Sequence, residues 1–216
     1  MLKKVIKVQS DTFLRLPLEK QEKLLGAAKE EFTKYSYDSV SLNQIIKKAG
    51  ISRGSFYMYF KGKEELYFYL IDRYLSQGFL LLEETLREQK GNFFPACNAF
   101  FAKALVFCSL EENRAFMKRI IENTNFYEES AQRKRKVVLQ SFERLEKLIQ
   151  KKDFTPLAQK HFKILCMQVF HLMMRNSFRI LHQKEKVDVV LQDFSEQLLL
   201  LKDGVCRKDD VDVKTA

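Results

Sequence analysis

Glycine and proline are scarce in this chain, with 7 Gly and 3 Pro among 216 residues. No alternating strand pattern of useful length appears either, so we expect an all-α fold with helices nearly throughout. No uninterrupted apolar segment reaches the roughly 18 residues that a membrane span requires. The lysines near Met1 precede no long apolar run, so no signal peptide is expected. These absences predict a cytoplasmic protein without a membrane partner.

The signatures of common enzymes and metal sites are also missing. The chain has no GxSxG motif, no Walker-type loop and no dinucleotide fingerprint. Its four cysteines and three histidines form no CxxC or HxxxH pair. Cys97 and Cys108 are eleven residues apart, as are His171 and His182. On a helix that offset separates a pair by roughly 16 Å, too far to share an ion. We therefore expect no enzyme, no metal and no cofactor.

A basic segment without acidic residues, SLNQIIKKAGISRGSFYMYFKGK, occupies residues 41–63 and holds five basic side chains. Its first apolar residues recur at the i, i+3, i+4, i+7 spacing of one helix face: Leu42, Ile45, Ile46 and Ala49. Ser41 can cap this helix, and Gly50 follows it where a left-handed residue ends a helix at least cost. Ser52 can cap a second short helix. Two short helices joined by a Gly-containing turn predict a helix-turn-helix that binds duplex DNA.

The second of these helices carries suitable chemistry for DNA contacts. Arg53 is the predicted base reader, because its guanidinium fork matches the O6/N7 edge of guanine. Gly54 would let the backbone approach the sugar–phosphate chain closely. Hydroxyls for phosphate oxygens and added positive charge come from Tyr57, Tyr59, Lys61 and Lys63. The alternative interpretation is a solvated basic surface on an ordinary three-helix domain.

Three pieces of the chain carry a family resemblance: KQEKLLGAAKEEF, Tyr37, and AGISRGSFYMYFKGKEEL. With them, residues 18–75 resemble the N-terminal domain of the TetR family of bacterial transcriptional repressors. The pattern AGxSxGxxYxxF followed by KxxL is specific, and the whole resemblance covers about a quarter of the chain. The resemblance implies DNA contacts at Ser41, Arg53, Gly54, Ser55, Tyr57, Tyr59 and Lys63. Ser41 and Tyr59 depart from the Thr and His that the family often has, and Ser36 replaces its usual Gly.

The chain is expected to divide into a small N-terminal domain and a larger helical one. We expect a basic N-terminal arm over 1–17, the helix-turn-helix domain over 18–75, an effector-binding and dimerisation domain over 76–203, and a disordered tail over 204–216. A long helix from about 62 to 89 should leave the first domain. Further helices are expected at about 94–110, 113–123, 127–151, 156–182 and 186–203.

Two segments of the larger domain, FFPACNAFFAKALVF and HFKILCMQVFHLMMRNSF, are dense in aromatic, Met and Cys side chains. Large soft side chains around an irregular space suit a pocket for a small, largely apolar effector. The candidate lining residues are Phe94, Cys97, Phe101, Leu105, Phe126, Phe142, Phe170, His171 and Met174. The alternative is a plain hydrophobic core, because such stripes at helical spacing are common in cores.

The last two expected helices are the predicted homodimer surface. A helix of about 27 residues from Pro156 would be roughly 40 Å long, longer than one small core needs. The last helix would place one apolar side toward the partner: Val190, Phe194, Leu198 and Leu201. Two helices from each subunit would form a four-helix bundle across a two-fold axis, as is common in the family. Such symmetry predicts a palindromic operator in double-stranded DNA.

The predicted function is therefore a ligand-responsive transcriptional regulator, most simply a repressor that an effector releases from its operator. Three alternatives stay open. The protein could be an activator, a nucleoid-type DNA binder without an effector, or a thiol-based redox-sensing regulator that uses its cysteines.

Overall fold

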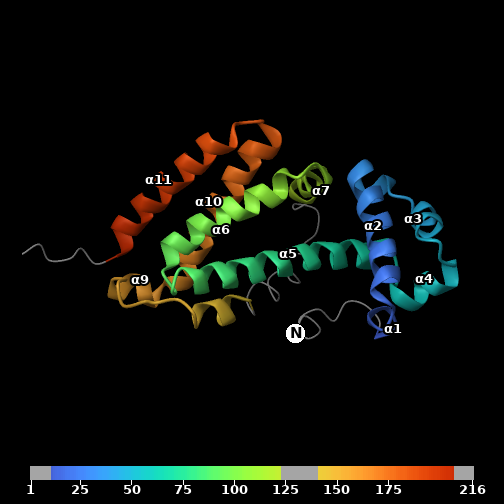
Figure 1. The fold of residues 1–216 in the computed structure, drawn as a ribbon, viewed down its shortest axis with the longest axis horizontal. Helices are drawn as coiled ribbons and strands as arrows, with labels where there is room; N and C mark the ends of the chain where they lie inside the picture. The colour runs from blue at the N-terminus through green and yellow to red at the C-terminus, as the bar shows by residue number, and fades with distance from the viewer. Residues whose placement is uncertain (1–10, 123–140, 207–216) are drawn as a thin grey trace, which may run out of the picture. The chain divides into compact units, whose positions relative to one another are not determined.

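The computed structural model describes residues 11–122 and 141–206, and within these ranges the protein is built from helices (Figure 1). The helices are α1 (Asp11–Leu14), α2 (Leu18–Lys34), the 3-10 helix η2 (Tyr37–Ser39), α3 (Leu42–Ala49), α4 (Arg53–Tyr59), α5 (Lys63–Glu88), α6 (Phe93–Ser109), α7 (Glu111–Glu122), α9 (Pro156–Lys160), α10 (Phe162–His182) and α11 (Val187–Val205). Residues 141–146 are also helical. Strand-like pairing in this part of the chain is limited to one isolated bridge between Phe154 and Cys206. The all-α prediction is confirmed.

The chain forms two compact units. The first comprises Met1–Phe79 and Leu110–Glu143, and the second comprises Leu80–Ser109 and Arg144–Ala216. Helix α5 runs without a break from Lys63 to Glu88, as expected for the long helix, and therefore contributes residues to both units. None of the described helices is by itself long and apolar enough to cross a membrane, although α6 and α7 taken together as one broken span would pass that test.

Aromatic side chains form much of the core of the first unit. Phe13 of α1 is fully buried, with ring centroids 4.9 Å from Phe60 and 5.5 Å from Tyr69. We expected residues 1–17 to form a basic arm. Its last part instead contains the short helix α1, which packs against the core of the first unit. Residues 1–10 of that arm lie outside the described residues.

Helix α7 completes the core of the first unit from a distant part of the sequence. Its Phe116 is fully buried, with its ring centroid 5.2 Å from that of Tyr74 on α5. Asn113 accepts a hydrogen bond from Lys29 Nζ of α2 at 2.7 Å, and Arg119 donates to the Thr33 carbonyl at 3.3 Å. Helix α7 is therefore held against α5 by an aromatic contact and against α2 by hydrogen bonds.

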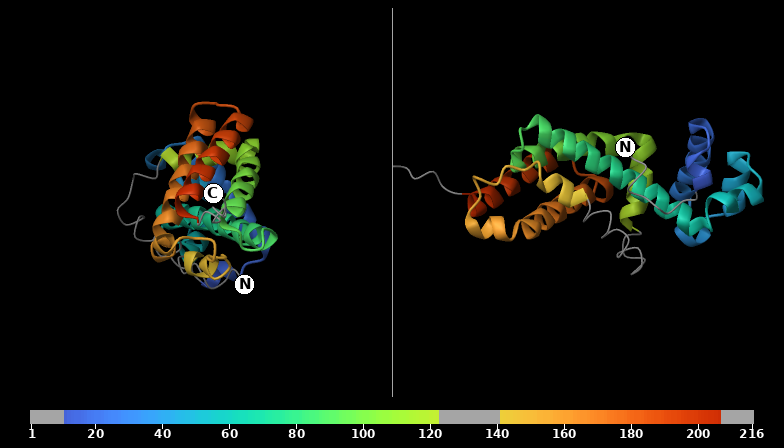
Figure 2. Two further views of the ribbon diagram at one scale, coloured as in Figure 1. Left: turned by 90° about the vertical axis from the view of Figure 1, so that its left-hand side faces the viewer. Right: turned by 90° about the horizontal axis from the view of Figure 1, so that it is seen from below.

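In the second unit, α6, α10 and α11 lie side by side (Figures 1 and 2). Phe101 of α6 and Phe194 of α11 are both buried, with ring centroids 4.2 Å apart. In the last turn of α10, Arg179 Nη2 lies within 2.6 Å of a carboxylate oxygen of Glu185 and of one of Asp193. The ring contact joins α6 to α11, and the ion pair of Arg179 with Asp193 joins α10 to α11.

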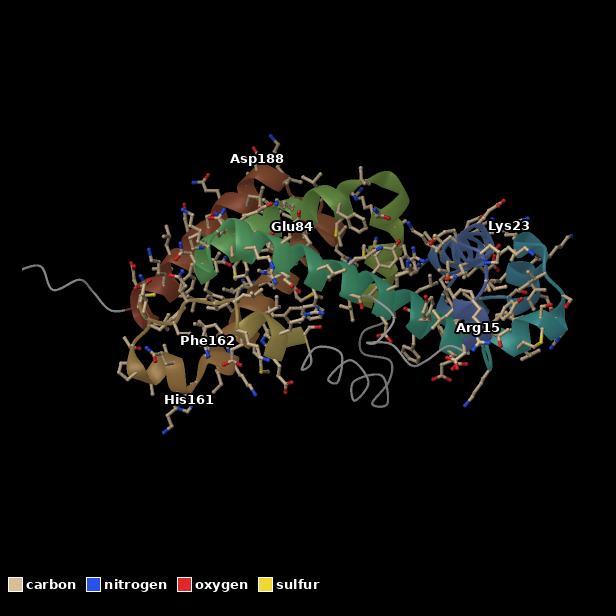
Figure 3. All side chains as sticks on the ribbon, turned by 60° about the horizontal axis from the view of Figure 1, so that its bottom comes forward. Arg15, Lys23, Glu84, His161, Phe162 and Asp188 are labelled. Atoms are coloured by element: carbon tan, nitrogen blue, oxygen red, sulfur yellow. The ribbon has the colours of Figure 1, made fainter. Side chains whose placement is uncertain are left out.

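Two expected helices differ from the structure. The predicted helix 156–182 breaks at His161, which has φ −108° and ψ 27° and separates α9 from α10. Exposed His161 and buried Phe162 lie next to each other at this break (Figure 3). Helix α11 continues to Val205, past the point where the tail was expected to begin. Most of the predicted helix 127–151, with Phe126 before it, falls outside the described residues.

Candidate nucleic-acid interface

The helix-turn-helix has the local capping that the sequence predicts. Ser41 Oγ accepts a hydrogen bond from the Gln44 N–H at 3.4 Å and caps α3. Gly50 ends α3 in the left-handed conformation, with φ 67° and ψ 33°. Ser52 Oγ accepts from the Ser55 N–H at 3.0 Å and caps α4. These side chains satisfy backbone groups at the helix ends and set the turn between α3 and α4.

The apolar faces of α3 and α4 are buried in the first unit. Ile45, Ile46 and Ala49 of α3 are buried, and so are Phe56 and Phe60 at the inner side of α4. Burial of these residues orients Arg53, Tyr57 and Met58 of α4 away from the core. The consequence is an outer surface whose residues do not contribute to the core.

The outer surface of α4 combines a guanidinium, a phenol and a thioether. Arg53 is exposed, and Tyr57 and Met58 are 48% and 57% exposed. Arg53 Nη1 donates to Asn43 Oδ1 at 3.1 Å, and Arg53 Nη2 donates to Tyr57 Oη at 3.4 Å. Gly54 is exposed, and a Cβ atom there would meet only Ser52 Oγ, at 3.8 Å. Helix α4 carries no acidic residue.

Ser55 and Tyr59 are less accessible than their neighbours on α4. Ser55 Oγ lies 2.8 Å from Ser52 Oγ and is half-buried. Tyr59 is half-buried with its ring centroid 6.0 Å from that of Phe13. Both residues therefore support the local structure of the helix-turn-helix in addition to any contact with DNA.

The two lysines after α4 have different environments. Lys61 is exposed, and its backbone N–H donates to the Glu65 carboxylate at the start of α5. Lys63 Nζ instead donates to three backbone carbonyls, those of Tyr37 at 2.9 Å, Asp38 at 3.0 Å and Val40 at 3.4 Å. An ammonium group has three N–H donors, so these contacts use all of them.

Acidic residues of α2 neutralise part of the basic segment. Lys48 Nζ lies 2.6 Å from Glu30 Oε1 and 3.7 Å from Glu31 Oε2. The hydrogen bond from Lys48 holds the pKa of the Glu30 carboxyl below its usual value. Buried Glu31 also accepts from the Ser41 N–H at 3.4 Å. Lys48 therefore tethers α3 to α2 through these ion pairs, although it is exposed like Lys47 and Lys61.

Sequence reasoning missed two residues of this surface, Asn43 and Met58. Both are exposed, and Asn43 contacts Arg53 across the turn. The available signal was position: Asn43 follows the first apolar residue of α3 and lies off its apolar face. Nothing in the sequence pattern indicated which side chain of α4 it would meet.

The eight predicted effector residues that the structure describes differ in burial and are divided between the two units. Phe94, Cys97, Phe101 and Leu105 are all buried along α6 in the second unit. On α10, Phe170 and His171 are exposed and Met174 is half-buried. Phe142 belongs to the first unit, where its ring centroid is 6.2 Å from that of Phe79.

The four cysteines are free, and burial raises the pKa of each thiol. The pKa reaches about 11 for Cys108 and about 12 for Cys166. Such thiols are protonated near neutral pH and are poor nucleophiles. Across residues 11–122 and 141–206, no group of three or more His, Cys, Asp or Glu side chains could hold a metal ion.

Comparison with known proteins agrees with this geometry. The profile of the bacterial regulatory proteins of the tetR family matches residues 24–70. The profile of the tetracyclin repressor-like C-terminal domain matches residues 92–205, more than half of the chain. The Bacillus subtilis transcriptional regulator YdgC is 32% identical over 102 residues, which are 47% of this chain and 52% of YdgC. The Staphylococcus aureus regulator QacR is 36% identical over 52 residues, 24% of this chain and 28% of QacR.

The chain thus matches about half of the length of YdgC and less of QacR. A solved TetR-family regulator from Pectobacterium atrosepticum has the same fold, with a TM-score of 0.61 and 18% identity over 90% of this chain and 99% of that one. The capped helix-turn-helix and the two matched domains lead to one conclusion. This chain belongs to the TetR family of DNA-binding transcriptional regulators.

Proposed function

We propose that the protein is a homodimeric repressor that occupies a palindromic operator until a small, largely apolar effector releases it. The observation that carries this proposal is the outer surface of α4, where Arg53, Gly54 and Tyr57 are exposed together without an acidic neighbour on that helix. A short helix of this kind fits the major groove. Arg53 would read a guanine, Gly54 would allow close approach, and Tyr57 would bind phosphate.

The other predicted DNA contacts take more specific roles in this proposal. Lys61 would add positive charge near phosphate. Ser41 and Ser55, at the starts of α3 and α4, would lie next to the sugar–phosphate backbone of the DNA. Tyr59 is half-buried and would contribute only its hydroxyl. Lys63 would act mainly through the turn that it holds, because its three donors already have acceptors.

The dimer is proposed to form through the outer side of α10. Exposed or half-buried side chains recur there at alternating spacings of three and four residues: Ile164, Met167, His171, Met174 and Phe178. Ile164 and Met167 are both more than half exposed although they are apolar. This spacing is typical of a helix that packs against a partner helix, and an uncovered apolar stripe of this kind supports an interface.

Three of the four α11 side chains that the sequence suggested for the partner are instead turned inward, and the fourth, Leu201, is half-buried. Val190 and Phe194 are fully buried, and Leu198 is 3% exposed. Their burial against the second unit's own core removes them from any partner. The exposed apolar side chains of α11 are Val189, Leu199 and Leu200, and these would take the place of the predicted set.

The effector is proposed to bind in the second unit beside α6. Phe94, Cys97, Phe101 and Leu105 line that core, and aromatic and sulfur-containing side chains accommodate apolar molecules of varied shape. Helix α5 would transmit the change, because it is continuous and contributes residues to both units. Coupling of the two sites is reciprocal, so the factor by which effector lowers operator affinity must equal the factor by which operator lowers effector affinity.

The DNA-binding proposal is tested by selecting bound fragments from random and genomic DNA at physiological salt, followed by salt titration of the best fragment. A palindromic consensus bound at least about 10³-fold more tightly than random DNA is expected. Salt-sensitive binding without a consensus would instead favour the nucleoid-type alternative. A reporter driven by the selected site then separates repression from activation.

The interface is tested by Met167→Glu, which should convert the dimer to a monomer in analytical ultracentrifugation. Leu157→Glu is the matched control, because Leu157 of α9 is also exposed and apolar but lies off the stripe. The effector proposal is tested by a thermal-shift screen of apolar small molecules. Each hit is followed by measurement of operator affinity with and without the compound, and of compound affinity with and without operator.

A further inference from the structure

One hydrogen bond joins the exposed surfaces of α3 and α4. Arg53 Nη1 donates to Asn43 Oδ1 at 3.1 Å, between the first turn of α3 and the first residue of α4. Both side chains are exposed, so the contact contributes little to the buried core. It does, however, fix the direction of the one basic side chain on α4.

The direction of an arginine side chain determines whether it can read a base. A free, exposed arginine samples many rotamers, and restricting them on binding reduces affinity. A guanine edge is read only when the guanidinium plane is aligned with the base pair. Asn43 accepts from Nη1, and the longer contact with Tyr57 Oη restrains Nη2 at 3.4 Å. A guanidinium has more N–H donors than these two contacts use, so donors remain for a base.

We infer that Asn43 is a positioning residue that holds Arg53 in the orientation required for base reading, so that α3 sets sequence preference through α4. This inference rests on the proposed role of Arg53 as a base reader. Asn43 itself need not touch a base, because its carbonyl oxygen acts by accepting from the arginine. Gln44, the next residue, is also exposed, and its backbone N–H donates to the capping hydroxyl of Ser41.

A direct phosphate contact by the Asn43 amide would have a different consequence. Phosphate contacts contribute to affinity without distinguishing sequences, so their loss weakens binding to every DNA alike. Loss of a positioning contact weakens discrimination at one base pair and leaves binding to unrelated DNA unchanged. The two roles are therefore separable by measuring affinity across operators that differ at single positions.

The experiment compares Asn43→Ala, Arg53→Ala, the double variant and the control Gln44→Ala on single-substitution operators and on unrelated DNA at one salt concentration. Arg53→Ala should lose the discrimination of one base pair, about 5- to 150-fold for a bidentate contact. Asn43→Ala should lower discrimination at that same pair by about three- to tenfold. It should add nothing in the Arg53→Ala background, and Gln44→Ala should match the wild type.

Asn43→Asp supplies the rescue, because a carboxylate also accepts from Arg53. It should retain discrimination while lowering affinity for all DNA through its negative charge.

Uniform weakening by Asn43→Ala, or a further loss of discrimination in the double variant, would overturn the inference. If Arg53→Ala relaxed no position, the base-reading role itself would be wrong and the inference would fall with it. If only Arg53→Ala relaxed a position, the inference alone would fail. Equal unfolding temperatures for Asn43→Ala and Gln44→Ala verify that folding is unchanged.

Discussion

The Lys63 ammonium group donates a 2.9 Å hydrogen bond to the carbonyl oxygen of Tyr37. It also donates to the carbonyl oxygens of Asp38 and Val40. The Lys63 ammonium also lies 5.0 Å from the centroid of the Tyr37 ring. Lys63 opens α5, so these contacts tie the long helix to the turn that precedes α3. A residue expected to contact phosphate is thus engaged within the protein.

Replacement of Lys63 by methionine should therefore lower stability as well as DNA binding. Loss of the ammonium removes one donor from each of three backbone carbonyls, and we expect the free energy of unfolding to fall by about 1–2 kcal/mol. Urea unfolding of the DNA-free protein measures this change. Lys61→Met is the matched control, with a change in stability of less than about 0.5 kcal/mol and a salt slope of DNA binding reduced by about one. Unchanged stability together with a reduced salt slope for Lys63→Met would identify Lys63 as a phosphate contact instead.

Gly54→Ala should stabilise the protein and weaken its binding to DNA. In α4 a Cβ atom at this position meets only Ser52 Oγ, and alanine in a helix is favoured over glycine by about 0.5–1 kcal/mol. The methyl group would stand between the helix backbone and the sugar–phosphate chain. Gly26→Ala on α2 is the control, because nothing lies within 4 Å of its Cβ position. Both variants are expected to unfold at higher urea concentration, and only Gly54→Ala should lose operator affinity. Equal operator affinity in the two variants would contradict close approach at Gly54.

The Glu30 carboxyl should titrate below its usual value because of the hydrogen bond from Lys48. A lowered pKa in the folded state means that the pair contributes stability above the unfolded pKa, which is near 4.5. That contribution is lost as the pH falls through the lowered value. NMR titration of the side-chain carboxyl should show the pKa returning toward 4.5 in Lys48→Met. Lys47→Met should leave the titration unchanged, and a similar return in both lysine variants would assign the shift to general positive charge.

The cysteine thiols should react slowly in the folded protein. At pH 7.5 a thiol with a pKa of about 11 is ionised to the order of one part in 10³ to 10⁴, so iodoacetamide labelling of Cys108 should be far slower than in the urea-unfolded chain. Mild oxidant should also leave operator affinity unchanged. Rapid labelling of the folded protein, or an oxidant effect that disappears in a cysteine-free variant, would favour the redox-sensing alternative.

Much of the helix-turn-helix could be predicted, because the sequence features that specify it are local. The cap at Ser41, the left-handed Gly50 and the cap at Ser52 each depend on a few neighbouring residues, and each occurs as the pattern predicts. The break at His161 was missed, because the apolar pattern continues across it and only the backbone conformation marks the end of α9. Hydrophobic spacing therefore located helices better than it located the joints between them.

The orientation of exposed and buried faces could not be predicted in the same way. Val190 and Phe194 form an apolar side of α11 by their spacing, but spacing does not say whether that side meets the chain's own core or a partner. Contact with α6, seen in the 4.2 Å ring separation of Phe101 and Phe194, decided in favour of the core. Burial depends on which helices lie adjacent, and this adjacency is a property of the whole fold.

The sequence by itself determined that the protein is helical and that residues 41–63 form a helix-turn-helix. It also determined that the second helix of this motif carries basic and hydroxyl side chains. Helix periodicity and capping act over a few residues, so a single sequence contains them. The tertiary structure decided that Asn43 meets Arg53, that Lys63 holds the turn at Tyr37 and that α7 packs on α2. Each of these contacts joins separate elements of the chain, and only the packing of those elements brings the partners within hydrogen-bonding distance.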